Sequence, residues 1–301
     1  MIAALKRLNI YQKEMYPIIP RLLLGYLVFG EIYFIILLNH GITDIKLGIP
    51  EIVCGFTVFS FLFWLRIADD FKDYELDCRL FKERPLPSGR VTKRDLGIFI
   101  TILIAITLIL NFIFMNNFLF CVLLYTYGSL MAVWFFQKHK IAKSLPLALV
   151  THNPVQIFIN LYIVSFTITK YNLPFLNLTN VLALLTLYFP ALIWEVSRKI
   201  KAPEDETEYV TYSKLFGYKK AINFVFIVTW MDIFTNFALV WNLSKWSVIA
   251  LLINVLWCSW KFIEFKKDPT RYKIVTKVET YTYIQESLMI LTIIFYLFTH
   301  R

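Results

Sequence analysis

The chain has 301 residues, of which 58% are hydrophobic and 18% aromatic, and its net charge is +10. Soluble domains contain about 45–50% apolar residues by a count that includes glycine. This composition therefore predicts an integral membrane protein, whose basic residues mark loops on one side of the bilayer rather than a nucleic-acid surface. The four cysteines are scattered, without the spacing of a zinc site or a disulfide framework.

The apolar segments predict an all-α fold. A helix needs about 20 mostly apolar residues to cross the hydrocarbon core of a bilayer. The alternating pattern of a membrane β-barrel is absent, and residues 1–17 lack the layout of a signal peptide. The sequence contains nine segments of suitable length, at 19–39, 48–67, 95–114, 117–136, 145–168, 174–195, 219–241, 246–265 and 279–299.

Basic residues are concentrated in alternate loops. The N-terminal tail and the loops after the second, fourth, sixth and eighth predicted spans hold most of the 31 Lys and Arg residues. The positive-inside rule then places the N-terminus and these loops in the cytoplasm and the C-terminus on the opposite side. The two long loops, 68–94 and 196–218, also carry acidic residues, so we expect the functional site on this side.

Carboxylates are clustered where the second predicted span ends. Asp69, Asp73 and Asp77 recur every four residues, with Asp70 beside them. If the helix continues past Arg66, the three recurring carboxylates lie on one face, where like charges are destabilising unless a cation binds. Their oxygens suit Mg²⁺, which also takes phosphate oxygens and water as ligands. The alternative is a solvated loop whose acids and bases pair with one another.

A basic loop follows the carboxylates and includes Arg79, Lys82, Arg84 and Arg90. Arg and Lys side chains neutralise phosphate oxygens that a metal ion leaves exposed. The acidic helix end and the basic loop together predict a site for Mg²⁺ and a diphosphate.

These residues resemble the first motif of the UbiA superfamily of intramembrane prenyltransferases. That motif reads N-D-x-x-D-x-x-x-D and is followed by R-P-L-P-S-G. Residues 69–77 read DDFKDYELD and residues 84–89 read RPLPSG, so only the leading Asn differs, as Asp69. The resemblance implies one domain over residues 1–301, with nine transmembrane helices bundled around a central cavity. It also implies Mg²⁺-dependent transfer of a prenyl group from an isoprenyl diphosphate to a small lipophilic acceptor, often aromatic.

The family's second motif, D-x-x-x-D, falls on residues 195–199 and departs from the pattern. Glu195 takes the first acidic position, but Lys199 takes the second. An ammonium group only donates hydrogen bonds, so Lys199 cannot be a metal ligand. Either Arg198 and Lys199 bind the diphosphate directly, or they only anchor the loop. A displaced carboxylate could come from Glu204, Asp205, Glu206 or Glu208.

The resemblance, together with the charge of the neighbouring cations, assigns roles to these residues. The metal ligands are Asp69, Asp70, Asp73, Asp77 and Glu195, of which all but Asp69 are expected to be catalytic. The diphosphate ligands are Lys82, Arg84, Lys138, Arg198 and Lys199. Lys138 is included because residues 134–138 match the family's Tyr-x-x-x-Lys with Trp134 in place of Tyr; Lys140 is the next choice.

Polar residues within the predicted spans are candidates for the acceptor pocket. His152 and Asn153 precede Pro154 in the fifth span, where the alternative role is hydrogen bonding between helices around a proline kink. Further polar side chains within spans are Glu31, Asp232, Asn236, Gln285 and Glu286.

Two other functions compete with prenyl transfer. A membrane terpene cyclase of the same superfamily would let the prenyl cation attack its own double bonds, and the unusual second motif leaves this open. A cation transporter would use the carboxylates as an ion path, but these clusters lie in loops rather than at the bilayer midplane, where transporters place their sites.

Overall fold

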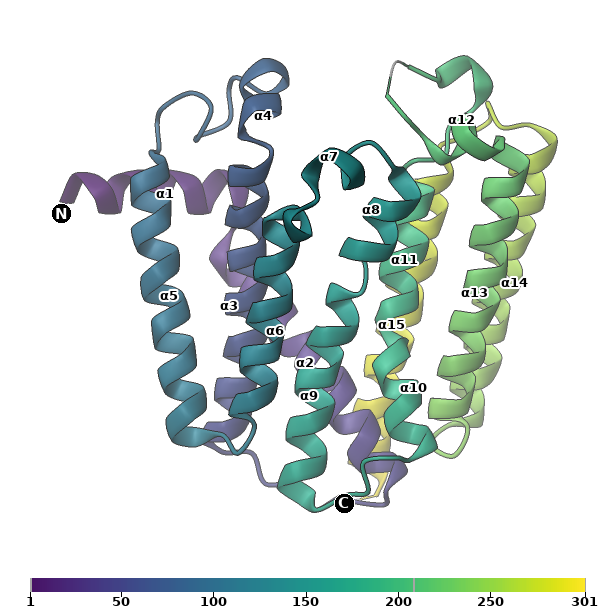
Figure 1. Ribbon diagram of the computed structural model, residues 1–301. Helices are drawn as coiled ribbons and strands as arrows, with labels where there is room; N and C mark the ends of the chain where they lie inside the picture. The colour runs from purple at the N-terminus through teal and green to yellow at the C-terminus, as the bar shows by residue number, and fades with distance from the viewer. Residues whose placement is uncertain (1, 208, 301) are drawn as a thin grey trace. The chain divides into compact units, whose positions relative to one another are not determined.

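We describe the fold from a computed structural model, which describes residues 2–207 and 209–300 (Figure 1). Every regular element in these ranges is helical, so the prediction of an all-α protein is confirmed. The chain divides into two compact units. The first consists of Met1–Gly30, Lys46–Lys138 and Ile168–Asn172, and the second of Glu31–Ile45, His139–Thr167 and Leu173–Arg301.

Eight helical segments of the described chain are long and apolar enough to cross a membrane, and each coincides with a predicted span. The remaining prediction, 117–136, corresponds to the shorter apolar helix Phe118–Ala132. The multi-pass character expected from the sequence is therefore confirmed. The eight segments are Ile18–Asn39, Ile49–Lys72, Lys93–Phe114, Leu145–Tyr171, Leu178–Ser197, Tyr218–Val240, Lys245–Lys267 and Ile274–Thr299.

The first unit is built around α3, which packs against α5 and α6, while α1 contacts α5 and lies across it in Figure 1. Hydroxyl groups join the packed helices, because the Ser60 hydroxyl lies 2.7 Å from that of Thr107 and 3.0 Å from that of Tyr125. Such bonds hold helices together in lipid. The helices of this unit are α1 (Ile2–Met15), the first part of α2 (Ile18–Asn39), α3 (Ile49–Lys72), α4 (Tyr74–Leu80), α5 (Lys93–Phe114) and α6 (Phe118–Ala132).

Helix α5 begins with a capping box that also fixes α1. The Asp95 backbone amide donates to the Thr92 hydroxyl at 3.1 Å, and the Asp95 carboxylate accepts from the Thr92 hydroxyl at 2.6 Å. The same carboxylate accepts two hydrogen bonds from Arg7, at 2.7 and 2.8 Å. Asp95 therefore ties the N-terminal helix to the end of the basic loop.

Gly128 on α6 permits the close approach of α3. A Cβ at this position would lie 2.2 Å from the Trp64 ring and 2.9 Å from the Phe61 ring. We expect Gly128→Ala to lower the free energy of unfolding by about 1–3 kcal/mol, because overpacking forces neighbouring side chains out of their rotamers. Thermal unfolding in detergent measures the effect. Gly97→Ala on α5, where a Cβ would meet no atom within 4 Å, is the control, and equal unfolding midpoints for the two variants would contradict the prediction.

Helix α6 ends in a left-handed turn. Trp134, Phe135 and Phe136 have φ angles of 54°, 48° and 57°, a conformation that costs roughly 1–2 kcal/mol for each residue other than glycine. The turn explains why the helix ends at Ala132, before the predicted boundary at residue 136. The short helix α7 (Lys138–Ile141) follows it.

In the second unit, α13 packs against α10, α11 and α14, and α15 packs against α14 and α11. Figure 1 shows α13 and α14 side by side near the yellow end of the colour scale. The helices are α8 (Leu145–His152), most of α9 (Val155–Tyr171), α10 (Leu178–Thr186), α11 (Tyr188–Ser197), α12 (Tyr212–Phe216), α13 (Tyr218–Val240), α14 (Lys245–Lys267) and α15 (Ile274–Thr299).

Two predicted spans are interrupted in this unit. The span 145–168 breaks between α8 and α9 at Asn153 and Pro154, and the span 174–195 breaks between α10 and α11 at Leu187. Proline has no backbone N–H and clashes with the preceding turn. Pro154 therefore ends α8, and Pro190 lies in the first turn of α11, where the missing donor is tolerated.

Candidate active site

The helix that carries the first motif continues as the spacing of its carboxylates predicts. Helix α3 runs past Arg66 to Lys72. The backbone N–H of Asp73 donates to Asp69 and that of Asp77 donates to Asp73, each at 2.9 Å, so the helical path is kept into α4. Asp69, Asp73 and Asp77 therefore follow one another at successive turns.

Asp70 is held by two neighbours and is only 4% exposed. Arg66 lies 2.7 Å from one carboxylate oxygen, and the Tyr11 hydroxyl donates to the other at 2.5 Å. Burial and the adjacent Asp70 charge raise the pKa of Tyr11, so the phenol keeps its proton and remains a donor. The sequence analysis missed Tyr11, because nothing in the local pattern links the N-terminal helix to the end of α3.

Asp77 on α4 is buried and accepts a hydrogen bond from Arg84 Nη1 at 2.8 Å. The Arg84 guanidinium also lies 3.9 Å from the centre of the Phe81 ring. The chain then turns back, with a bond from the Ser88 backbone N–H to the Arg84 carbonyl at 3.0 Å and a left-handed Gly89 (φ 76°). The Pro-Leu-Pro-Ser-Gly turn thus holds Arg84 against Asp77.

Asp69 is partly exposed and pairs with Lys72 at 2.9 Å. The Lys72 ammonium also lies 4.8 Å from the centre of the Trp134 ring, within range of a cation–π interaction. Lys72 therefore connects the end of α3 to the left-handed turn that precedes Lys138.

Asp73 lies at the junction of α3 and α4 and is half-buried. Within the described residues it has no ion-pair partner at salt-bridge distance. Burial raises the pKa of Asp73; Lys72 opposes the rise, the Asp69 and Asp77 charges add to it, and Lys138 opposes it from α7. The ionised carboxylate is thus poorly compensated, and a bound cation would stabilise it.

The chemistry of these donors fits Mg²⁺, which prefers oxygen ligands. In the two described ranges of the chain, no three His, Cys, Asp or Glu side chains are grouped closely enough to hold a metal ion. Mg²⁺ needs only one or two carboxylates and completes its shell with water and phosphate oxygens. The carboxylates would therefore hold the ion together with a diphosphate rather than as a preformed cage.

Two predicted diphosphate ligands of the first unit are exposed. Lys82 lies in the loop after α4, and Lys138 is the first residue of α7. Lys138 lies within electrostatic range of Asp73. The alternative choice, Lys140, is also exposed.

In the second unit, Glu195 near the end of α11 is engaged by both following cations. Arg198 donates to its two oxygens at 2.5 and 2.9 Å, and Lys199 lies 2.8 Å from Oε1. The Arg198 guanidinium also lies 5.3 Å from the centre of the Trp194 ring. Lys199, which stands where the family has a second carboxylate, thus neutralises the first one.

Three of the four acidic candidates beyond Glu195 are described, and each is either exposed or bonded within its own loop. Glu206 accepts hydrogen bonds from the Thr211 hydroxyl at 2.7 Å and the Ser213 hydroxyl at 2.6 Å, so it closes its own loop. Glu204 and Asp205 are exposed on the short 3₁₀ helix Pro203–Asp205. Glu208, the fourth candidate, lies outside the described residues.

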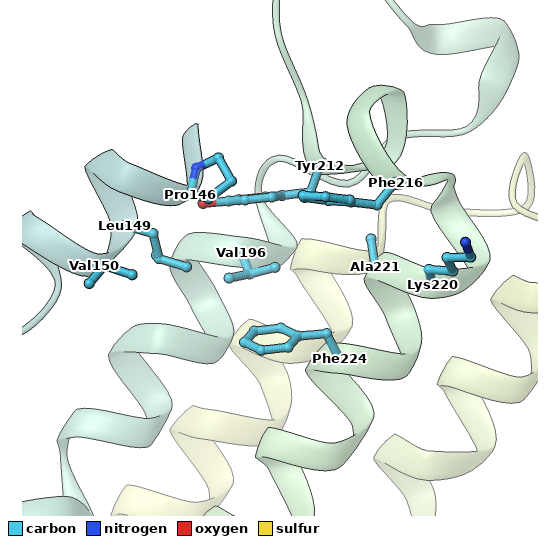
Figure 2. A pocket seen from close by; sticks show the side chains of 9 residues that line it. All are labelled: Pro146, Leu149, Val150, Val196, Tyr212, Phe216, Lys220, Ala221 and Phe224. Atoms are coloured by element: carbon cyan, nitrogen blue, oxygen red, sulfur yellow. The ribbon is translucent and has the colours of Figure 1, made fainter. Parts of the chain in front are cut away.

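An apolar groove of about 410 Å³ adjoins the second motif, between α8, α11, α12 and α13. Tyr212 and Phe216 lie across the groove from Phe224 in Figure 2. Burial, and secondarily the Glu195 charge, raise the pKa of Tyr212 to about 12, which places this wall within electrostatic range of Glu195. The lining residues are Pro146, Leu149, Val150, Val196, Tyr212, Phe216, Lys220, Ala221 and Phe224.

His152 and Asn153, the predicted acceptor residues, lie at the break between α8 and α9 and are half-buried. The Thr151 hydroxyl lies 3.0 Å from His152 Nδ1. One turn further on, Gln156 donates to Asn160, which donates to the Leu184 carbonyl on α10 at 2.8 Å. These hydrogen bonds join neighbouring helices close to Pro154. Hydrogen bonding between helices is the alternative role that the sequence analysis gave for the polar residues of this region.

The structure gathers the predicted residues into two sets. The first set, which lies in the first unit, consists of Asp69, Asp70, Asp73, Asp77, Lys82, Arg84 and Lys138. The second set, which lies in the second unit, consists of His152, Asn153, Glu195, Arg198 and Lys199.

Comparison with known proteins supports the fold. No protein-family model matches the chain, and no curated protein matches it. Among solved structures, a chain from a study of digeranylgeranylglyceryl phosphate synthase in membranes matches 97% of this chain and 99% of its own length. The TM-score is 0.63 and the sequence identity 16%. That protein is a UbiA-superfamily membrane prenyltransferase, so the expected UbiA-like fold is confirmed.

Proposed function

We propose that this chain is a Mg²⁺-dependent membrane prenyltransferase that transfers a prenyl group from an isoprenyl diphosphate to a small lipophilic acceptor, with an aromatic acceptor as the expected class. The observation that carries the proposal is the acidic helix end, Asp69 to Asp77, closed by the Arg84 turn. The shared fold supports the membrane setting and the prenyl diphosphate substrate.

The first unit supplies the metal and diphosphate ligands in this proposal. When bound, Mg²⁺ supplies positive charge that stabilises the leaving diphosphate. Asp69, Asp73 and Asp77 would hold the ion with Asp70, whose orientation is set by Arg66 and Tyr11. The diphosphate oxygens would accept hydrogen bonds from the predicted ligands Lys82, Arg84 and Lys138.

The second unit would contribute charge more than metal ligation. Both oxygens of Glu195 are engaged by Arg198 and Lys199, so Glu195 would be a weaker metal ligand than Asp73, which has no ion-pair partner at salt-bridge distance in the described residues. We assign Arg198 and Lys199 to the diphosphate, where a cationic side chain replaces part of the charge of a second metal ion. Stabilising a leaving group needs positive charge at the right place rather than a particular ion.

The proposal keeps the remaining expectations from the sequence. Residues 1–301 would form one domain of nine spans around a central cavity, with the shorter helix α6 as the ninth crossing. The N-terminus and both motif loops would face the cytoplasm, and the C-terminus the opposite side. His152 and Asn153 would lie in the acceptor pocket.

Release of diphosphate from prenyl diphosphates tests the function directly. Membranes that contain the protein are incubated with prenyl diphosphates of several chain lengths, with Mg²⁺ or with a chelator. Release that requires both the protein and Mg²⁺ supports the proposal, and no release from any substrate would overturn it. Product analysis without an acceptor distinguishes the alternative, because a cyclised hydrocarbon or alcohol would identify a terpene cyclase.

A further inference from the structure

Helix α1 presents one face to the first motif and to the loop 81–92 that follows it. Arg7, Tyr11 and Glu14 are spaced four and three residues apart, so they lie on the same side of the helix. Each of the three forms hydrogen bonds with a different part of the first unit. Together they connect α1 to the start of α5, to the acidic helix end and to the loop.

The middle contact of this face reaches a predicted metal ligand. The Tyr11 hydroxyl donates to Asp70 Oδ2 at 2.5 Å, and Arg66 on α3 lies 2.7 Å from Asp70 Oδ1. An ionised carboxylate has about four lone-pair acceptor sites, so one partner on each oxygen leaves sites for a metal ion. Tyr11 and Arg66 therefore fix the orientation of the carboxylate and leave it able to act as a ligand.

The Tyr11 ring is held by apolar packing that includes the loop. Tyr11 is 1% exposed and belongs to the same buried cluster as Phe63, Leu86 and Val91. Its ring is stacked with that of Phe63 at a distance of 6.4 Å between ring centres. Leu86 lies in the Pro-Leu-Pro-Ser-Gly turn, and Val91 lies near the end of the loop. The packing of the loop and the position of the Tyr11 hydroxyl are thus linked.

Two ion pairs hold α1 in place on either side of Tyr11. Arg7 donates to both carboxylate oxygens of Asp95, at 2.7 and 2.8 Å. Glu14 accepts two hydrogen bonds from the Arg90 guanidinium, at 2.5 and 2.8 Å. Both partners of the second pair are exposed, so water weakens it. The hydrogen bond from Tyr11 is the fully buried contact of the three.

We propose that Tyr11 is a positioning residue of the metal site. Its hydroxyl fixes the orientation in which Asp70 meets Mg²⁺, and the ion pairs of α1 keep that hydroxyl in place. This inference rests on the proposed function, because it takes Asp70 to be a ligand of Mg²⁺. Removal of a hydrogen bond that orients a metal ligand typically lowers metal affinity by about 10- to 100-fold.

Binding of Mg²⁺ with inorganic diphosphate tests this role without prenyl transfer. The full-length protein in a neutral detergent is freed of metal ions with a chelator. Its unfolding midpoint is then followed while Mg²⁺ is added at a fixed, saturating concentration of inorganic diphosphate. Tyr11→Phe removes the hydroxyl and keeps the ring. We expect this variant to raise the free Mg²⁺ concentration at half of the maximal shift by about 10-fold or more.

Tyr16→Phe is the matched control. Tyr16 lies in the same cluster and stacks on Phe63 at 4.2 Å, but its hydroxyl donates to the Phe59 carbonyl at 3.4 Å rather than to a carboxylate. This variant should leave the half-maximal Mg²⁺ concentration unchanged. A double variant shows whether Tyr11 acts through Asp70: in an Asp70→Asn background, Tyr11→Phe should have little further effect, because residues in one hydrogen-bond network are not additive.

Equal half-maximal Mg²⁺ concentrations in Tyr11→Phe and Tyr16→Phe would overturn the proposal, and so would additive effects of Tyr11→Phe and Asp70→Asn. A wild-type protein that Mg²⁺ and inorganic diphosphate do not stabilise would overturn it as well. The proposed function is judged separately, by diphosphate release from prenyl diphosphates. If the wild type released none, that function would fall, and the Mg²⁺ titration would still decide the role of Tyr11.

Discussion

Replacement of Asp73 by Asn is expected to lower the rate of Mg²⁺-dependent diphosphate release by about 100-fold or more, since the loss of one preorganised group at a developing charge has effects of that size. Among the four aspartates predicted as metal ligands in the first motif, Asp73 has no ion-pair partner at salt-bridge distance in the described residues, whereas the other three do. Asn keeps the size of the side chain and removes the charge. The rate is measured in membranes over a range of Mg²⁺ concentrations, and the half-maximal concentration should also rise.

The same variant should fold at least as well as the wild type. Burial, together with the Asp69 and Asp77 charges, raises the pKa of Asp73, so its ionised form is unfavourable in the folded state. Neutral Asn removes that cost, and the unfolding midpoint should not fall. Glu75→Gln, at an exposed position on α4, is the matched control and should retain the wild-type rate. Equal rates in Asp73→Asn and Glu75→Gln would remove Asp73 from the site.

Lys199→Met is expected to reduce kcat/KM for the prenyl diphosphate by about 10- to 100-fold, as for the loss of one charge-assisted hydrogen bond. The substitution removes the cation that stands in the second acidic motif and lies 2.8 Å from Glu195. If Lys199 binds the diphosphate, KM should rise. Steady-state kinetics with a single prenyl diphosphate separate KM from kcat.

Two further variants test whether the charge of Lys199 is what matters. Lys199→Arg keeps the charge and should recover most of the activity. Lys201→Met removes a neighbouring cation from the same loop and should have a small effect. A loss in Lys201→Met as large as that in Lys199→Met would instead indicate general attraction of an anionic substrate to a basic loop.

The membrane helices could be predicted because bilayer thickness sets the length of their apolar runs. Helices α2 and α13, for example, lie within one residue of their predicted bounds. The break at Leu187 was not predicted, although Pro190 nearby is a local signal. The left-handed turn at residues 134–136 has no local signal, because such a conformation normally requires glycine and this segment is Trp-Phe-Phe.

Site contacts could be anticipated where helical geometry alone creates them. The pairing of Glu195 with Arg198 and Lys199 follows from three- and four-residue spacing. The contact between Tyr11 and Asp70 joins residues 59 positions apart and depends on how α1 crosses the unit. Such a contact depends on tertiary packing, which short-range patterns do not encode.

The early end of α6 has a consequence for the bilayer itself. Helix α6 is the proposed ninth crossing of the membrane. Its 15 residues have a length of about 22 Å, whereas the hydrocarbon core of a bilayer is roughly 30 Å thick. Such hydrophobic mismatch is relieved when the membrane thins locally. The bilayer beside α6 would then be thinner by about 8 Å in total, and its polar surfaces would lie closer to the midplane. A prenyl diphosphate would meet Lys138 at this thinner region with its tail still in the lipid phase.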